Sequence, residues 1–266
     1  MPELPEVETI ARCLRTHIVG ETLRDILVFW PATVEGDPKL FRRAFRHRTI
    51  TSVERRGKYL IVDTDGDFRL SMHLRMSGKL TFQLDERDGK HLRIQFKFHS
   101  QRSLFFVDIR KFGRIRLWTK QEPLLPRLGR EPLASQDILN TLGNLSSRRT
   151  IKGLLLDQRV LAGLGNIYVD EILYRAGIHP ATPLPRLGRR AITRIAEITP
   201  ALLMKAIDNG GTTLVNYRPP DRPQGNNQYF LQVYGRTGQP CHRCGTKIQR
   251  QRVAGRSSHF CPRCQK

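Results

Sequence analysis

Residues 241–264, CHRCGTKIQRQRVAGRSSHFCPRC, contain two CxxC pairs that are separated by sixteen residues. Two such pairs can close a tetrahedral thiolate site around Zn²⁺. Four thiolates leave no coordination position open for a substrate, so we expect one structural zinc ion per chain. A segment this short has little apolar core, and the metal would supply most of its folding free energy, on the order of 10 kcal/mol. The expected ligands are Cys241, Cys244, Cys261 and Cys264.

The segment between the two cysteine pairs is basic, and its pattern predicts a β-hairpin. The sequence AGRSS at its tip would place Arg256 at the turn. There the guanidinium could enter a groove of DNA, or it could only contact a phosphate, and the sequence leaves both interpretations open.

The whole chain is strongly basic. Its 266 residues include 46 Lys and Arg against 24 Asp and Glu, which gives a formal net charge of +22. Such an excess favours a polyanionic partner, because each neutralised phosphate releases condensed counterions. A basic enzyme without such a partner is the alternative. No apolar run approaches the length of a membrane span and no signal-peptide pattern is present, which predicts a cytoplasmic protein.

The pattern of apolar residues predicts an α+β protein with several domains. Residues 5–19 carry an apolar stripe at helical spacing, with Pro5 in the first turn and Gly20 just past the end. Short alternating segments between about residues 22 and 118 predict an antiparallel β-sandwich. A proline-rich segment follows, and residues 136–208 are then mostly helical in pattern.

The chain begins MPELPEVETI, so removal of Met1 would expose the secondary amine of Pro2 next to Glu3. The predicted helix would place both residues at its N-terminus, where the positive end of the helix dipole disfavours protonation of an amine. The terminus could be no more than a solvated end. Alternatively, it could be an amine nucleophile with its own carboxylic acid.

Two further groups of residues indicate contacts with DNA. The turn in LAGLGNIY leads into a helix N-terminus, where Asn166 and backbone N–H groups could bind a phosphate together with Arg149 and Lys152. The segments HLRMSG and DIRKFG carry three residues that could enter a base stack and fill the space left by an extruded nucleotide, or could simply pack in a core. These are Met76, Arg110 and Phe112.

In this order, the segments resemble the formamidopyrimidine-DNA glycosylase family over the whole chain. The matching stretches are PELPEVET, GKYL, HLRMSGKL, RKFG, GLGNIYVDEILYRAGIHP, GGTTL, QVYGR and CPRCQK. The resemblance implies an N-terminal catalytic helix with an antiparallel β-sandwich in residues 1–122 and a linker in 123–135. It also implies a helix–two-turn–helix domain with a lesion-capping loop in 136–231 and a zinc-finger β-hairpin in 232–266.

The resemblance implies roles for the catalytic residues. Pro2 would attack C1′ of the damaged nucleoside and form an iminium intermediate, and an α-amine suits this step because its pKa is lower than that of lysine. Glu3 would donate or shuttle a proton, and Glu6 would be a supporting carboxylate. Lys58 would act near the lesion phosphate and in β-elimination. Arg256 would bind phosphate and assist δ-elimination.

The resemblance also supplies the expected contacts with DNA. Arg148 or Arg149 would replace a lysine-rich stretch of the family, and Arg93 stands where many relatives have a second histidine. The loop 212–229 diverges from the family pattern, which leaves the lesion preference open, and the role of Glu171 is open too. The expected DNA-binding residues are His91, Arg110, Arg148, Arg149, Lys152 and Asn166. The expected void-filling residues are Met76, Arg110 and Phe112, with Arg110 facing the orphaned cytosine.

The implied function is that of a bifunctional DNA glycosylase and AP lyase of base excision repair. It would excise 8-oxoguanine and formamidopyrimidines from duplex DNA through the Pro2 iminium and β,δ-elimination. Its partner would be double-stranded DNA with oxidised bases or abasic sites. The protein would act as a monomer in the cytoplasm, associated with the nucleoid and not with a membrane.

Two alternatives remain at this point. An endonuclease VIII-like glycosylase would prefer oxidised pyrimidines, but the separation of Met76 from Phe112 along the chain favours the purine branch. A non-catalytic zinc-ribbon protein would explain the charge and the cysteines equally well. It would not explain the presence of Pro2, Glu3 and Lys58 in the same chain.

Overall fold

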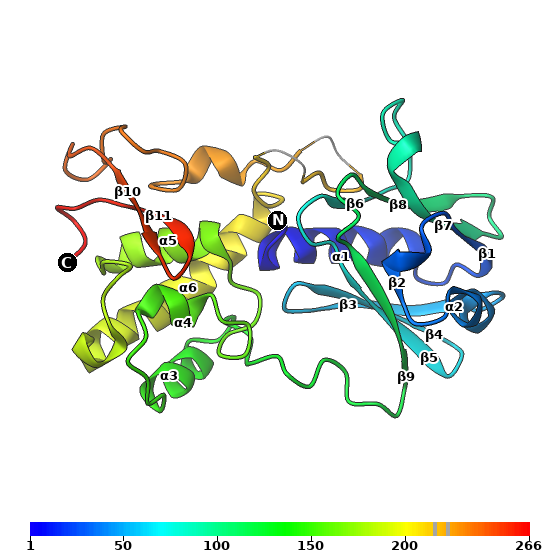
Figure 1. Cartoon of the computed structure of the whole chain (residues 1–266), viewed down its shortest axis with the longest axis horizontal. Helices are drawn as coiled ribbons and strands as arrows, with labels where there is room; N and C mark the ends of the chain where they lie inside the picture. The colour runs from blue at the N-terminus through cyan, green and yellow to red at the C-terminus, as the bar shows by residue number, and fades with distance from the viewer. Residues whose placement is uncertain (215–216, 222–223) are drawn as a thin grey trace. The chain divides into compact units, whose positions relative to one another are not determined.

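The computed structural model describes residues 1–214, 217–221 and 224–266. Contacts between residues divide the chain into two compact units, which are described separately below. The first unit consists of Met1–Pro126 and Asn209–Gln228, and the second of Arg127–Asp208 and Tyr229–Lys266. Figure 1 shows strands β1 to β9 in the first unit and helices α3 to α6 with the hairpin β10–β11 in the second.

The first unit contains two β-sheets. Every strand pair in them is antiparallel except β2 with β9, so the predicted antiparallel sandwich is confirmed. The four-stranded sheet has the order β1 (Leu23–Val28), β7 (Leu92–Phe98), β8 (Ser103–Asp108) and β6 (Gly78–Thr81). The five-stranded sheet has the order β2 (Val34–Glu35), β9 (Arg114–Thr119), β5 (Phe68–His73), β4 (Tyr59–Thr64) and β3 (Ile50–Arg56).

Helix α1 (Leu4–Ile18) joins the two sheets through a common apolar core. The predicted stripe is buried, and α1 packs against β3 at the edge of the five-stranded sheet (Figure 1). Each fully buried aliphatic side chain of this stripe contributes about 1.5–3 kcal/mol to folding. The helix start is thereby fixed against the sandwich. The other helices of this unit are α2 (Pro38–Phe45), η1 (Pro31–Thr33), η2 (Gly89–His91) and part of η4 (Asn227–Phe230).

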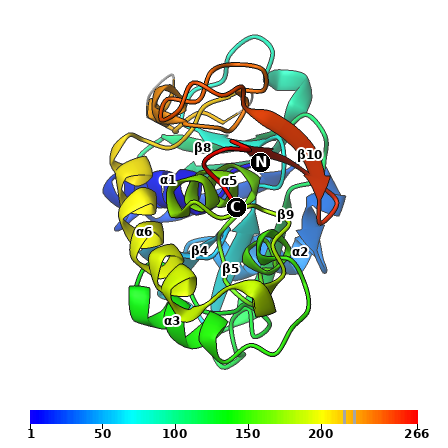
Figure 2. The ribbon, with the colours of Figure 1, turned by 90° about the vertical axis from the view of Figure 1, so that its left-hand side faces the viewer.

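The second unit is built around α5 (Asn166–Ala176), which is buried along nearly its whole length. Helices α4 (Ile151–Leu155) and α6 (Arg189–Asp208) pack on it. Helix α3 (Ser135–Gly143) packs against α6 (Figure 2). The hairpin strands β10 (Gln249–Val253) and β11 (Arg256–Phe260) form the predicted antiparallel pair, and β11 lies against α5. A short helix, η3 (Leu184–Arg186), precedes α6. Helix α5 ends at Gly177, whose φ of 71° is the left-handed cap that its sequence predicts.

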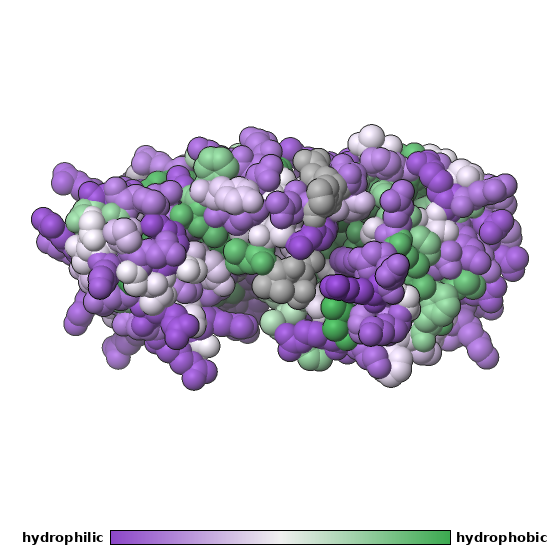
Figure 3. All heavy atoms as spheres, turned by 90° about the horizontal axis from the view of Figure 1, so that it is seen from above, coloured by the Kyte–Doolittle hydropathy of each residue, from purple (hydrophilic) through white to green (hydrophobic). Residues whose placement is uncertain are grey.

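The predicted domain boundaries remain predictions, although one segment groups differently in the structure. Residues 209–228, which the sequence analysis assigns to the helical domain, make their contacts within the first unit. Four residues of the predicted lesion-capping loop, 215–216 and 222–223, lie outside the described residues. None of the helices in the described ranges is long and apolar enough to cross a membrane. Hydrophilic side chains cover most of the face shown in Figure 3, and apolar ones form small separate patches.

Candidate active site and nucleic-acid interface

Pro2 and Glu3 lie at the start of α1, and both are buried. Glu3 is the N-cap residue, and it forms a capping box with Glu6, in which each side chain accepts from the other residue's backbone N–H. The N–H of Glu3 donates to Oε2 of Glu6 at 2.8 Å. These two bonds fix the backbone directly after Pro2. The nitrogen of Pro2 becomes a secondary amine only when Met1 is removed.

Glu6 also holds a distant segment against the helix start. Its Oε1 accepts from the backbone N–H of Thr212 at 2.8 Å, so the two oxygens have different partners. Gly211 comes so close that a Cβ there would lie 3.1 Å from Cγ of Glu6, and its φ of +77° is one that glycine adopts without strain. The sequence GGTTL is thus explained by a close approach to the N-terminus. This arrangement makes Glu6 a fixed structural carboxylate beside Pro2.

Lys58 is buried at the turn between β3 and β4, after Gly57 with a φ of 59°. Its charge acts on His73 in the neighbouring strand. Burial, together with the positive charges of Arg75 and Lys58, lowers the pKa of His73 to about 3. His73 is therefore neutral at physiological pH, and its Nδ1 accepts from the N–H of Arg75 at 2.9 Å.

The three predicted void-filling residues form one exposed cluster in the first unit. A guanidinium nitrogen of Arg110 lies 3.1 Å from Sδ of Met76, and Cζ of Arg110 lies 4.6 Å from the centre of the Phe112 ring. Met76 and Phe112 are 43% and 46% exposed, which is unusual for large apolar side chains. The structure therefore places these side chains at the surface and not in the core. An Arg between two apolar side chains is well suited to enter a base stack.

Asp108 supports this cluster through hydrogen bonds to both of its loops. The sequence analysis did not identify this residue. Its buried carboxylate accepts from the hydroxyl of Ser77 at 2.5 Å, from the N–H of Arg110 at 3.1 Å and from the N–H of Gly113 at 2.7 Å. It thus ties the loop that carries Met76 to the loop that carries Arg110. An acidic residue at the end of an apolar strand, LFFVD, was the available signal.

Arg93 also holds the loop that carries Arg110, through the backbone of Asp108. A register shift between Leu92 and Ile94 interrupts the alternation of β7, and Arg93 is buried, although the alternation predicts it on the polar face. Its Nε donates to the carbonyl oxygen of Asp108 at 2.8 Å. The replacement of a family histidine by Arg93 therefore yields a contact that supports the loop.

His91 lines a cavity of about 540 Å³ in the first unit. Ser77 and Ile109, the neighbours of Met76 and Arg110 in sequence, lie on the wall of the same cavity. His91 is thus close to the void-filling cluster. The remaining lining residues are mostly charged, namely Lys79, Asp85, Arg87, Asp88, Lys90 and Arg218, together with Val107.

The other predicted DNA-binding residues belong to the second unit. Arg148 and Arg149 are exposed, and Arg149 pairs with Asp157 at 2.9 Å. Asn166 starts α5, and its Nδ2 donates to the carbonyl oxygen of Ser257 in the hairpin at 2.8 Å. Arg148 and Arg149 are thus open to solvent, as a phosphate contact requires, whereas Nδ2 of Asn166 already has an acceptor within the protein.

Lys152 departs from its predicted role. Its side chain is 0% exposed, and Nζ lies 2.6 Å from Oδ1 of Asp170. Nζ also donates to the carbonyl oxygen of Ser257 at 2.9 Å. A buried ammonium with two internal acceptors cannot reach a phosphate, so the expectation of direct DNA contact is corrected to an internal contact. Sequence spacing could not show this, because Asp170 and Ser257 are distant in the chain.

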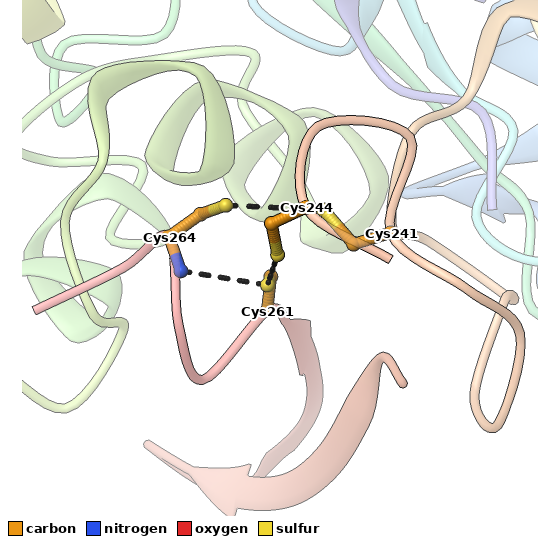
Figure 4. A group of neighbouring side chains, drawn as sticks. All are labelled: Cys241, Cys244, Cys261 and Cys264. Carbon is orange, nitrogen blue, oxygen red and sulfur yellow. Dashed lines mark hydrogen bonds between the residues drawn. The ribbon is translucent and has the colours of Figure 1, made fainter. Parts of the chain in front are cut away.

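The four predicted zinc ligands converge at the end of the second unit (Figure 4). Their sulfur atoms all lie within 4.8 Å of one another, with Cys244 and Cys261 at 3.5 Å and Cys241 and Cys264 at 3.9 Å. A tetrahedron with Zn–S bonds of about 2.3 Å has edges of about 3.8 Å, so the cysteines fit one Zn²⁺.

Tyr174 adds a contact to this cysteine cluster. It is buried on α5, and its hydroxyl lies 3.2 Å from Sγ of Cys241. The guanidinium of Arg243 lies 4.5 Å from the centre of the tyrosine ring. A hydroxyl that donates to a metal-bound thiolate stabilises its negative charge, so Tyr174 is a supporting residue that the sequence analysis did not identify.

Glu171 anchors the segment that leads into the zinc finger. Its carboxylate accepts from the N–H groups of Gln232, Val233 and Tyr234, each at 2.9–3.0 Å. Burial raises the pKa of Glu171, and the three N–H donors oppose that shift. The role that the sequence left open is therefore that of an anchor for residues 232–234.

Three family models match successive parts of the chain. A family model described as the formamidopyrimidine-DNA glycosylase N-terminal domain matches residues 1–115. The formamidopyrimidine-DNA glycosylase H2TH domain matches residues 128–217, and the zinc finger found in FPG and IleRS matches residues 238–266.

Individual relatives match over the full length. The formamidopyrimidine-DNA glycosylase of Herpetosiphon aurantiacus is 44% identical over 274 residues, with 100% of both chains covered. That of Geobacillus kaustophilus is 42% identical over 275 residues, again with 100% of both covered. Lactococcus lactis Fpg, solved with DNA that contains an abasic site, is 39% identical with a TM-score of 0.91 over 99% of both chains. MutM, solved with DNA that contains carbocyclic 8-oxo-G, is 39% identical with a TM-score of 0.89 over 100% of both.

Proposed function

Because the chain belongs to the formamidopyrimidine-DNA glycosylase family, we propose that it removes oxidised purines from duplex DNA in base excision repair, with Pro2 as its nucleophile. The solved complexes of two relatives contain DNA with carbocyclic 8-oxo-G in one case and with an abasic site in the other. Family membership supports these two lesions as substrate classes. The net charge of +22 suits a DNA partner. As a monomer with such a partner, the protein would act at the nucleoid.

The observation that carries this proposal is the construction of the helix start. Glu3 and Glu6 cap α1 mutually, and Thr212 closes the arrangement, so the residue before Glu3 is held in one place. A nucleophile must be held in this way to attack C1′ in line. A solvated terminus would need none of these bonds.

The proposed chemistry begins with the neutral amine of Pro2. Its nitrogen forms a bond to C1′ as the glycosidic bond to the damaged base breaks, and the base leaves with the bonding electrons and a proton. Glu3 is the acid placed to supply or relay that proton. The Pro2 nitrogen then loses its proton and its lone pair expels O4′, which takes up a proton, so that the sugar ring opens and a C1′=N⁺ iminium forms. The iminium makes the hydrogen on C2′ acidic, so that loss of this proton expels the 3′-phosphate. A second elimination expels the 5′-phosphate, and water releases Pro2.

Residues of each unit would hold the DNA during these steps. We propose that Met76, Arg110 and Phe112 fill the space left by the extruded nucleotide, with His91 near their base. Lys58 would act on the lesion phosphate and in β-elimination. In the second unit, Arg148, Arg149 and Arg256 would bind phosphates, and Arg256 would assist δ-elimination. Asn166 would contribute its backbone N–H at the start of α5, because its Nδ2 is bonded to Ser257.

The zinc ion would organise the finger and take no part in the reaction. Four cysteines fill the coordination sphere and leave no position for water or substrate. Its chemistry is therefore limited to holding the two CxxC loops together, which positions the hairpin that carries Arg256.

A duplex that contains 8-oxoguanine opposite cytosine tests the proposal against its alternatives. The proposal predicts base loss followed by a strand break with phosphate at both ends, the product of β,δ-elimination. The matched substrate is the same duplex with thymine glycol, and faster cleavage of that DNA would assign the chain to oxidised pyrimidines. Binding without cleavage of either duplex, in a preparation that lacks Met1, would leave only a DNA-binding protein.

A further inference from the structure

The carboxylate of Asp170 is fully buried and has three hydrogen-bond donors. Lys152 Nζ lies 2.6 Å from Oδ1, and the backbone N–H and Nδ1 of His259 lie 2.8 and 3.0 Å from Oδ2. Lys152 belongs to α4, Asp170 to α5 and His259 to β11. One carboxylate therefore joins two helices to a strand of the finger hairpin, all within the second unit.

The carbonyl oxygen of Ser257 is held from two further directions. Lys152 Nζ donates to it at 2.9 Å, and Nδ2 of Asn166 donates to it at 2.8 Å. Lys152 thus bridges Asp170 and Ser257 with a single ammonium group. Ser257 directly follows Arg256, whose own side chain is exposed. The strand is consequently fixed one residue away from the arginine that faces solvent.

Thermodynamic stability alone does not explain this arrangement. Removal of two charges from water costs several kcal/mol per ion, and a packed apolar pair of similar volume is often as stable or more stable. A buried ion pair differs from an apolar pair because it holds its partners in one orientation. Charge-assisted hydrogen bonds are short and have strict geometry. Direction matters here because a two-stranded hairpin has only marginal stability and would not fix its own orientation.

We propose that Lys152 and Asp170 are positioning residues that fix the hairpin strand so that Arg256 points at the DNA. The inference rests on the proposed role of Arg256. It gives Lys152 a function that does not require contact with DNA, and it assigns one to Asp170. Both residues act through the backbone of Ser257 and His259 and not through the zinc ligands.

Full-length Lys152→Met and Asp170→Asn variants test this inference, alone and combined with Arg256→Ala. Asp137→Asn is the matched control, because Asp137 forms an exposed ion pair with Arg130 in the same unit, 2.6 Å apart, and belongs to α3 and not to the hairpin. If a single variant does not fold, the Lys152→Met/Asp170→Asn double variant removes both charges together and serves in its place. Zinc content and thermal unfolding establish that each variant is folded.

Two readouts are expected to change together. Affinity for a duplex with a reduced abasic site should fall about tenfold or more in either single variant, since charge-assisted hydrogen bonds contribute that much. Hydrogen exchange at the backbone N–H of His259 should be faster at unchanged zinc content. In the Arg256→Ala background, the same substitutions should change the affinity by less than about twofold, because they act through Arg256.

Three results would overturn the inference. The first is wild-type affinity and wild-type exchange at His259 in both variants. The second is an undiminished loss of affinity in the Arg256→Ala background, which would show that Lys152 and Asp170 do not act through Arg256. The third is wild-type affinity in Arg256→Ala itself, which leaves nothing to position. In that third case covalent trapping at Pro2 would still show the proposed chemistry. A failure of the positioning role can therefore be distinguished from a failure of the proposed function.

Discussion

Two regions of the molecule carry the exposed side chains that we propose contact DNA, and they are supported in different ways. The loops with Met76, Arg110 and Phe112 rest on the apolar core that α1 shares with both sheets. The hairpin with Arg256 rests on a small apolar cluster in which two of the five fully buried members are cysteines, Cys241 and Cys261. In the first region the buried carboxylate of Asp108 aligns the two loops, and Arg93 holds its backbone. The second combines a metal site with buried ionic contacts.

The difference follows from the size of the available core. Where two sheets and a helix bury enough apolar surface, the backbone of a loop is already fixed and a single acceptor sets its orientation. Where a short segment cannot bury that much, metal coordination and charge-assisted hydrogen bonds replace packing. Disturbances of the hairpin should therefore be cooperative, and disturbances of the first region should stay local.

The largest effect is expected for Cys244→Ser. Loss of one thiolate should release the zinc ion and unfold the finger, and affinity for lesion-containing DNA should fall by more than about 100-fold. The sandwich of the first unit should keep its structure, because its core contains no part of the finger. Fluorescence anisotropy with labelled duplex and far-ultraviolet circular dichroism would measure the two consequences. Unchanged affinity at zero zinc content would contradict a structural role of the metal in DNA binding.

Asp108→Asn should have the next largest effect, this time in the first region. The amide removes the charge that Ser77, Arg110 and Gly113 face, which should cost about 3 kcal/mol of stability and lower the rate of 8-oxoguanine excision about 30-fold. Phe112→Ala, which removes an exposed side chain only, should lower that rate about tenfold with an unchanged melting temperature. Single-turnover excision and thermal unfolding distinguish the two. Equal melting temperatures for wild type and Asp108→Asn would contradict the supporting role of Asp108.

A pH effect should arise from His73 in the same region. Its pKa is about 3 in the folded chain and 6.5 as an ordinary value, so the unfolded chain binds the proton more readily. Stability from this residue is therefore complete above pH 6.5 and is lost as the pH falls towards 3, by about 2 kcal/mol between pH 8 and pH 5. Urea unfolding of wild type and His73→Gln at both pH values would show the difference. Parallel losses of stability in the two proteins would refute it.

The smallest effect is expected for Tyr174→Phe, which tests whether the tyrosine hydroxyl stabilises the zinc site next to the hairpin. Removal of the hydroxyl that contacts Cys241 should cost about 1 kcal/mol and speed the loss of zinc to a chelator a few-fold, without a change in zinc stoichiometry. The release can be followed with a chromogenic chelator. Tyr229→Phe is a suitable control, because Tyr229 is exposed and lies outside the apolar cluster around the cysteines. Identical release rates would show that the hydroxyl does not support the thiolate.

The sequence predicts those features that depend on local pattern. The apolar stripe locates α1 almost to the residue, and the two CxxC pairs predict the cysteine cluster. The roles of Asp108 and Asp170 could not be predicted, because their hydrogen-bond partners come from distant segments of the chain. A single carboxylate also produces no periodic pattern in the sequence. Lys152 was expected at the DNA for the same reason, since its burial depends on contacts with residues far along the chain.

Local pattern also fails where a strand is irregular. The alternation in β7 predicts Arg93 on the polar face, whereas the register shift beside it turns the side chain towards Asp108. A bulge of this kind is set by pairing with β1 and β8 and cannot be read from one strand. The contacts between Glu6 and Thr212 are equally invisible, because they join the two ends of the first unit.

Covalent trapping tests the central claim, that the amine of Pro2 is the nucleophile. Protein without Met1 would be mixed with duplex DNA containing 8-oxoguanine opposite cytosine in the presence of borohydride, which reduces an iminium to a stable amine. We expect a protein–DNA adduct that peptide mapping locates at Pro2 and that disappears in Pro2→Ala, while Glu6→Gln still forms it. An adduct located at Lys58, or one that persists in Pro2→Ala, would contradict the claim.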